Sequence, residues 1–288
     1  MLVASLSADN FRSLKNVEMP VAARVTAIIG PNGAGKTNLI EALYFGLTGK
    51  SFRTADRRDL IPFGDSYARV KVKVESEPGI SHEFFSSTSR SEGARFAMDG
   101  APIDRVAAAG FRPMISVFSP DRLEIVKGPP ATRRAHLDAF IAARWPSRSG
   151  ARTKFGRALA QRNALLTRIQ KGMSSTSELA PWDRQVAESG AELGQTRAQA
   201  VEELAEPFRS SSAEIGLEGE VGLEYRAGAV LDAAGLEAGL AERLDNDVRH
   251  GRTTWGPHHD EIRIDFNGRQ LRRFGSQGQQ RLGLLALF

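Results

Sequence analysis

The chain of 288 residues contains no cysteine, which excludes a disulfide framework and removes the most specific ligand of zinc sites. Its apolar runs are short: the longest, such as LGLLALF at 282–288, fall far below the roughly 20 residues of a membrane-spanning helix. The first residues lack a basic flank, and Asp9 and Arg12 interrupt them before the apolar segment of a secretory signal can form. These absences favour a cytoplasmic protein with no membrane partner.

Several catalytic signatures are also missing. The chain has no dinucleotide-binding G-x-G-x-x-G and no Ser-His-Asp order, so oxidoreductase and covalent hydrolase functions have no support. His258 and His259 are adjacent in sequence, and their side chains therefore diverge rather than converge on a metal. We interpret them as part of a structural loop that touches nucleotide or DNA.

Composition is that of a globular protein, with 41% hydrophobic and 25% charged residues. The net charge of +5 and a pI near 9.7 favour polyanionic partners. At this length the chain can form one large domain or two modest ones.

The most specific stretch is GPNGAGKTN at 30–38, which follows the apolar run VTAII and precedes an amphipathic helix beginning near Thr37. It satisfies G-x-x-x-x-G-K-[ST], in which glycines let backbone N–H groups surround a triphosphate, the lysine reaches the β and γ phosphates and the hydroxyl of Thr37 ligates Mg²⁺. The sequence therefore predicts a nucleotide site; the alternative is a glycine-rich turn. The predicted ATP-binding residues here are Gly30, Pro31, Asn32, Gly33, Ala34, Gly35, Lys36, Thr37 and Asn38.

Alternating and helical patterns divide the chain into parts. Extended segments are expected near 2–6, 14–19 and 24–30, followed by an antiparallel meander from 67 that ends at the turn Asp99-Gly100. Helices are expected from about 131 to 212, with strands and helices again after that. We expect an α/β fold with a mixed sheet: an N-terminal head part at 1–125, a helical arm at 126–215 and a C-terminal head part at 216–288.

Charge in the expected arm is uneven. Residues 127–172 contain eleven lysines and arginines against one acid, Asp138, whereas residues 178–220 contain ten acids against three arginines. One interpretation is a basic helix that faces DNA; the other is an antiparallel helix pair in which opposite charges neutralise each other. Arg53, Arg57 and Arg58 pose the same choice between ligand contacts and a solvated cluster with nearby aspartates.

Six segments of the chain carry a resemblance to a known family. In order along the chain they are NFRSLKNVEM, GPNGAGKTNLIEALYF, SFRTADRRDLI, FSPDRLEIVKGPPATRRAHLD, GPHHDE and GSQGQQR. They resemble the RecF family of bacterial recombination mediators, which is related to SMC-type and ABC ATPases. The resemblance implies an ABC-type P-loop head with an inserted helical lobe and an ATP-dependent homodimer. It also implies binding to double-stranded DNA or duplex/single-strand junctions, partner mediator proteins that load recombinase onto gapped DNA, and roles in replication-fork maintenance and the SOS response.

In such proteins a short Ser/Gly/Gln loop at a helix N-terminus caps the ATP of the partner subunit. Ser276 at an N-cap with free N–H groups behind it is suited to holding a γ-phosphate. The residues of this loop are Ser276, Gln277, Gly278 and Gln279.

Two departures from the family pattern bear on activity. The acidic Walker B segment, which holds Mg²⁺ and positions water, has no counterpart up to Phe288, so we expect a chain lacking the C-terminal part of the head, able to bind ATP but not to hydrolyse it efficiently. Asp121 of Ser119-Pro120-Asp121 stands where ABC proteins often place a Mg²⁺-sensing glutamine; a simple turn is the other interpretation. Competing functions are an ABC nucleotide-binding subunit for transport and a non-enzymatic DNA-binding module.

Overall fold

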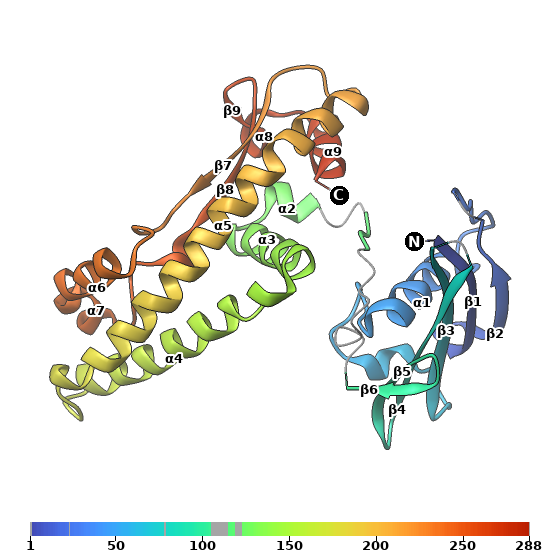
Figure 1. Cartoon of the computed structure of the whole chain (residues 1–288), viewed down its shortest axis with the longest axis horizontal. Coiled ribbons are helices and arrows are strands. Elements are labelled where there is room, and N and C mark those ends of the chain that lie inside the picture. The colour runs from blue at the N-terminus through green and yellow to red at the C-terminus, as the bar shows by residue number, and fades with distance from the viewer. Residues whose placement is uncertain (1, 23, 78, 105–114, 119–122, 288) are drawn as a thin grey trace. The chain divides into compact units, whose positions relative to one another are not determined.

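The computed structural model of the chain describes residues 2–22, 24–77, 79–104, 115–118 and 123–287 (Figure 1). These residues fall into two compact units, unit 1 (Met1–Val117) and unit 2 (Phe118–Phe288). Residues expected to form the helical arm and those expected to form the C-terminal head part lie together in unit 2. The reason is a single long helix that packs against both groups.

Unit 1 is built on one antiparallel sheet in the order β2-β1-β3-β4-β5-β6. Hydrophobic residues alternate along its longest strands, and in β3 the side chains of Val70, Val72 and Val74 are fully buried. The β5–β6 hairpin turns at Asp99 and Gly100, both at positive φ, as the expected turn requires. The strands are β1 (Leu2–Phe11), β2 (Leu14–Pro20), β3 (Tyr67–Glu77), β4 (Ile80–Ser89), β5 (Gly93–Met98) and β6 (Ala101–Ile103).

One helix, α1 (Lys36–Thr48), covers a face of this sheet and packs on β1, β3 and β4 (Figure 1). Its apolar face buries Phe45, which contacts the ring of Phe11 at a centroid distance of 5.7 Å. The helix approaches β3 closely because of Gly46, where a Cβ atom would lie 2.5 Å from a methyl of Val72. A short 3-10 helix, η1 (Arg57–Leu60), follows.

The expected strand at 24–30 does not form. This segment has no strand geometry, and the side chains of Val25 and Ile29 are 81% and 91% exposed. An extended run becomes a strand only where a neighbour supplies backbone hydrogen-bond partners, and none of the described strands pairs with it. The hydrophobicity of VTAII was therefore insufficient to place it in a sheet.

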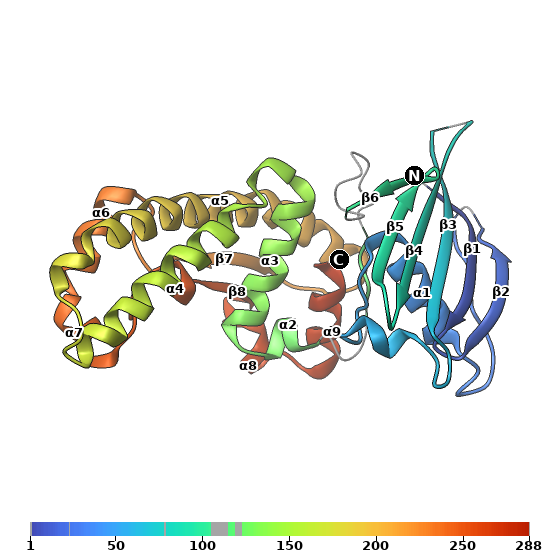
Figure 2. The ribbon, with the colours of Figure 1, turned by 90° about the horizontal axis from the view of Figure 1, so that it is seen from below.

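Unit 2 is organised around α5 (Ala180–Glu214), a helix of 35 residues. It packs against α3, α4, α6, α9 and strand β7 (Figures 1 and 2). Small buried residues such as Gly190 and Gly194 allow these close approaches. The other helices are α2 (Glu124–Lys127), α3 (Pro130–Arg144), α4 (Ala151–Gln170), α6 (Ala233–Glu242), α7 (Leu244–His250), α8 (Leu271–Phe274) and α9 (Gln277–Ala286), with 3-10 turns η4 (Pro146–Arg148), η5 (Thr176–Glu178) and η6 (Pro257–His259).

A small antiparallel sheet completes unit 2, with β7 (Val221–Arg226), β8 (Glu261–Phe266) and β9 (Arg269–Gln270) in that order. Together the units form the α/β fold that the sequence predicts. The parallel pairing of a mixed sheet is not among the described strands, since all their pairs are antiparallel. The strand expected at 24–30, which remains unpaired, was one candidate for it.

Candidate nucleotide site

The glycine-rich loop and the start of α1 have the geometry of a phosphate-binding turn. Gly33 and Gly35 adopt φ angles of 84° and 91°, in the left-handed region that favours glycine. At Gly35 a Cβ atom would also lie 3.2 Å from the hydroxyl of Ser13. The loop therefore needs glycine at this position both for its backbone conformation and for its contact with the β1–β2 turn.

Lys36 points back into this loop. Its Nζ donates hydrogen bonds to the carbonyl oxygens of Gly30 and Pro31, each at 2.8 Å. The first turn of α1 has no acidic residue and no side-chain cap, so its N-terminal partial charge is not compensated locally. The ammonium group and the helix end thus gather positive potential at one place, next to the exposed hydroxyl of Thr37.

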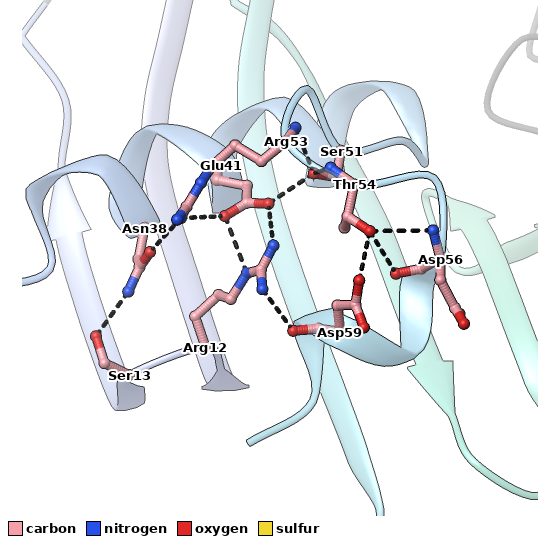
Figure 3. Close-up of polar contacts among 9 residues, drawn as sticks. All are labelled: Arg12, Ser13, Asn38, Glu41, Ser51, Arg53, Thr54, Asp56 and Asp59. Atoms are coloured by element: carbon pink, nitrogen blue, oxygen red, sulfur yellow. Dashed lines mark hydrogen bonds and ion pairs between the residues drawn. The ribbon is translucent and has the colours of Figure 1, made fainter. Parts of the chain in front are cut away.

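A buried carboxylate anchors α1 just behind the loop (Figure 3). The side chain of Glu41 is fully buried and accepts two hydrogen bonds from Arg12, Nε at 3.1 Å and Nη2 at 2.9 Å. Ser51 Oγ donates to the same carboxylate at 2.6 Å, and Arg53 Nη1 donates at 3.1 Å. The guanidinium group of Arg12 also donates to the carbonyl of Asp59 at 2.8 Å, which connects α1 to η1.

Electrostatics keeps this carboxylate ionised. Burial by itself would raise the pKa of Glu41, but hydrogen bonds from Arg12 and Ser51 and the charges of Arg12 and Arg53 outweigh it, so the pKa lies below its ordinary value. The sequence analysis did not single out Glu41 or Arg12. The available signal was a glutamate among the apolar residues LIEALYF. The sequence does not reveal that the cations paired with it lie 29 residues upstream and 12 residues downstream.

The same network reaches the last residue of the loop. Asn38 donates to Ser13 Oγ at 2.7 Å and accepts from Arg53 Nη1 at 2.9 Å. Arg53 therefore positions α1 through Asn38 and Glu41. The other two arginines of this segment make local contacts: Arg58 pairs with Asp56 at 2.9 Å, and Arg57 Nε donates to the carbonyl of Gly49 at 3.0 Å.

The second predicted stretch, 276–279, forms the start of α9 in unit 2. Ser276 is the N-cap, as expected: its Oγ accepts from the N–H of Gln279 at 3.2 Å, and Gln279 Oε1 accepts from the N–H of Ser276 at 2.8 Å. Gln277 and Gly278 are exposed. This reciprocal capping box leaves the amides of Gln277 and Gly278 without an acceptor among the described residues.

Buried ion pairs fix the elements around α5 in unit 2. Arg197 is paired with Asp138 and Asp260, each at 2.8 Å, and Tyr225 donates to Asp260 at 2.6 Å. Burial, with the charge of Asp260, raises the pKa of Tyr225. Arg133 pairs with Glu261 at 2.7 Å. The ATRRAHLD segment is therefore a structural anchor between α3, α5 and β8.

The histidine pair has a packing role as far as the described residues show. His258 Nε2 lies 3.1 Å from the carbonyl oxygen of Thr253, and the ring packs on Phe155. The rings of His258 and His259 lie side by side with centroids 4.2 Å apart, so the expected divergence of the two side chains is wrong. Among the residues that the structure describes, no cluster of three or more potential metal ligands occurs. Ser119, Pro120 and Asp121, considered above as a sensor or turn, lie outside the described residues.

Ion pairs account for part of the uneven charge of the arm. Arg162 on α4 contacts Asp183 at 2.6 Å, and Lys154 contacts Glu192 at 3.3 Å. As the residue number rises on α4 it falls on α5, which shows that the two helices are antiparallel. Charge neutralisation between α4 and α5 therefore accounts for Lys154 and Arg162, and leaves other cations of the basic segment without an acidic partner on α5 among the described residues.

Comparisons with known proteins agree with this geometry. The family described as RecF/RecN/SMC N terminal domain matches residues 2–96. The DNA replication and repair protein RecF of Anaeromyxobacter sp. (strain Fw109-5) is 36% identical over 299 residues, which cover 100% of this chain and 79% of the relative. RecF of Heliobacterium modesticaldum (strain ATCC 51547 / Ice1) is 30% identical over 296 residues, with the same coverage of 100% and 79%.

Solved structures give the same result. A structure of the recombination mediator protein RecF with ATP, from the RecFOR pathway, superposes with a TM-score of 0.88 at 27% identity, covering 99% of this chain and 79% of that one. An Smc head bound to the C-winged helix domain of ScpA shares the fold, with a TM-score of 0.54 at 19% identity over 100% of this chain and 75% of that one. The chain therefore belongs to the RecF family of DNA replication and repair proteins, which are ATPases of the ABC/SMC type.

Proposed function

We propose that this protein is an ATP-controlled DNA-binding head in which two copies close over ATP. Residues 30–38 of one copy hold the nucleotide, and residues 276–279 of the other cap its γ-phosphate. The observation that carries the proposal is a pair of helix N-termini with unsatisfied backbone N–H groups. One is the N-terminus of α1 behind the glycine loop, and the other is the N-terminus of α9 behind Ser276. Both offer N–H groups to an anion, and each lies in a different unit of the chain.

In the phosphate loop, ATP replaces internal contacts. The two carbonyl oxygens that hold Lys36 Nζ are weaker partners for an ammonium group than phosphate oxygens, so Lys36 moves to the β and γ phosphates when ATP binds. The exposed hydroxyl of Thr37 then ligates the Mg²⁺ that accompanies ATP. The network of Glu41 and Arg53 holds α1 in place during this exchange.

In the capping loop, Gln277 and Gly278 supply the N–H groups. A Cβ atom added to Gly278 would meet only the Ser276 hydroxyl, at 3.8 Å, so a phosphate can approach the backbone closely. A ligand that is complete only between two copies stabilises the dimer by mass action. ATP binding and dimerisation are therefore one equilibrium.

The dimer is proposed to bind double-stranded DNA or duplex/single-strand junctions. The net positive charge of the chain supports this, as does the role of its relatives in DNA replication and repair. Action in the cytoplasm alongside recombination mediator proteins, loading of recombinase at gaps, replication-fork maintenance and a part in the SOS response follow from the family assignment and belong to the same proposal.

The test is sedimentation velocity and duplex binding with no nucleotide, with ADP, and with a non-hydrolysable ATP analogue plus Mg²⁺. We expect a dimer and tighter DNA binding with the ATP analogue only. Lys36→Ala should lose both together, whereas Lys50→Ala, which removes an exposed lysine just after α1, should lose neither. Retention of the dimer and of DNA binding by Lys36→Ala at the same analogue concentration contradicts the proposal. Tight DNA binding with no response to nucleotide favours a non-enzymatic DNA-binding module instead.

A further inference from the structure

Helix α4 contains no acidic residue along its 20 positions, although it lies beside the acidic helix α5. Its inward face carries the buried residues, including Phe155, Leu165 and Leu166, and the fully buried Arg162. At 100° per residue, Arg157, Arg168 and the C-cap residue Lys171 fall on the opposite face. We call these three residues the outer cations of α4.

Pairing distinguishes the outer cations from the other basic residues of α4. Arg162 contacts Asp183 and Asp247, each at 2.6 Å, and cations at the flank of the helix pair likewise meet acids of α5. The outer cations are exposed and make no ion pair with any residue of the described ranges. Their charge is therefore available to an external anion.

A neighbouring loop extends this positive surface. Thr167 Oγ1 donates to the carbonyl of Gly251 at 3.1 Å, and Gln170 Nε2 donates to the carbonyl of Arg249 at 2.6 Å. These bonds hold the segment after α7 against the C-terminal half of α4. Arg252 is exposed there and, within the part of the chain that is described, has no acidic partner.

The length and residue types of this surface favour duplex DNA over single-stranded DNA and membranes. Residues 157 and 171 are 14 positions apart, a rise of about 21 Å along the helix. That exceeds the roughly 12 Å width of the B-DNA major groove, so a helix lying across the groove reaches phosphates on both edges. The outward face has no aromatic residue for stacking on single-stranded bases and no large apolar residue for insertion into a membrane. Small residues, Ala160 and Ala164, separate the cations and leave room for a phosphate backbone.

We propose that the outer cations of α4 form a duplex-DNA backbone contact surface on unit 2. Each contributes a sequence-independent phosphate contact, so the surface positions the protein on DNA without reading bases. This inference rests on the proposed DNA-binding function and adds the location of one contact surface.

The experiment compares two triple variants with the wild type in the presence of the ATP analogue and Mg²⁺. The test variant is Arg157→Gln, Arg168→Gln and Lys171→Gln. The matched control, Arg144→Gln, Lys154→Gln and Arg209→Gln, removes the same formal charge from exposed cations of unit 2 that are paired with Glu203, Glu192 and Glu206. Circular dichroism and binding of the ATP analogue verify that all three proteins are folded.

The readout is the dependence of duplex affinity on salt concentration. Each phosphate contact contributes about 0.9 to the slope of log K against log salt. We expect the test variant to lose about 2 to 3 from this slope and about 10-fold or more in affinity at low salt, and the control to lose little of either. An unchanged slope in the test variant overturns the inference, and so do equal losses in both variants, which indicate a general charge effect. Absence of duplex binding by the wild type overturns the proposed function as well.

Discussion

Removal of the Glu41 carboxylate tests whether the buried network behind the phosphate loop stabilises unit 1. Glu41 is fully buried and accepts four hydrogen bonds, two of them from Arg12, whose side chain is 21% exposed. Breaking a buried ion pair from one side costs about 3–5 kcal/mol, because the remaining charge keeps its desolvation penalty. Arg12 can regain some water, so we expect Glu41→Ala to lose about 3 kcal/mol of the free energy of unfolding.

Arg53 provides the matched comparison. Its side chain is 45% exposed, and its contact with Glu41 is the outer part of the network. Exposed pairs contribute about 0–1 kcal/mol, so Arg53→Ala should destabilise unit 1 by less than about 1 kcal/mol. The two variants remove opposite ends of one ion pair, and the difference between them measures the effect of burial.

The assay is urea unfolding followed by far-ultraviolet circular dichroism and by tryptophan fluorescence. All three tryptophans, Trp145, Trp182 and Trp255, lie in unit 2, so fluorescence reports that unit while circular dichroism reports both. Glu41→Ala should shift the circular dichroism transition. A loss below about 1 kcal/mol, or equal losses for Glu41→Ala and Arg53→Ala, would refute the reasoning.

Lowering the pH gives the same test without mutation. The folded-state pKa of Glu41 lies below its ordinary value of 4.5, so its contribution is complete above that pH. As the pH falls through 4.5, Glu41 in the unfolded chain takes up a proton, and its contribution to the free energy of unfolding begins to decrease. The contribution is lost once the pH falls below the folded-state pKa of Glu41. The wild type should therefore lose more stability than Glu41→Gln between pH 6 and the acid limit of the assay.

Three further outcomes are expected. Gly46→Ala should lower the free energy of unfolding by about 1–3 kcal/mol, because its Cβ would lie 2.5 Å from Val72. Gly156→Ala, whose Cβ would meet nothing within 4 Å, should raise it by up to about 1 kcal/mol. Urea unfolding measures both. Ser276→Ala should destabilise α9 by about 1 kcal/mol and Ser276→Gly by a few tenths, with hydrogen exchange of the α9 amides as the readout, and equal effects would contradict a capping role. Burial lowers the pKa of His258 to about 4, so unit 2 should lose about 3 kcal/mol as the pH falls from 6.5 to 4, and His258→Gln should remove that loss in tryptophan-monitored unfolding.

Local signals in the sequence were sufficient for most elements. The helix beginning near Thr37, the N-cap at Ser276 and the turn at Asp99-Gly100 each depend on residues within four positions of one another. The structure confirms all three, with the helix beginning at Lys36. The alternation in β3 was equally readable, because one face of that strand is buried and the other is not. The α/β class follows from these local patterns.

Assignments that depend on distant partners could not be read in the same way. The run VTAII has the composition of a strand, yet strand formation requires a neighbour, and no described strand supplies one. Glu41 is buried in an apolar helix only because Arg12, 29 residues away, neutralises it. Arg197 and Asp138, 59 residues apart, form a buried pair that neither segment reveals by itself.

The phosphate-loop motif at residues 30–38 could be predicted from spacing and glycine content, which are local properties, whereas residues 276–279 were predicted from the resemblance to the RecF family. Nucleotide binding by either stretch stays a prediction. The tertiary structure decided which charges remain available. It pairs Arg162 and Lys154 with α5 and leaves Arg157, Arg168 and Lys171 facing outward. A charge is neutralised by whichever group lies within a few ångströms in space, and that distance is set by packing between helices, not by position along the chain.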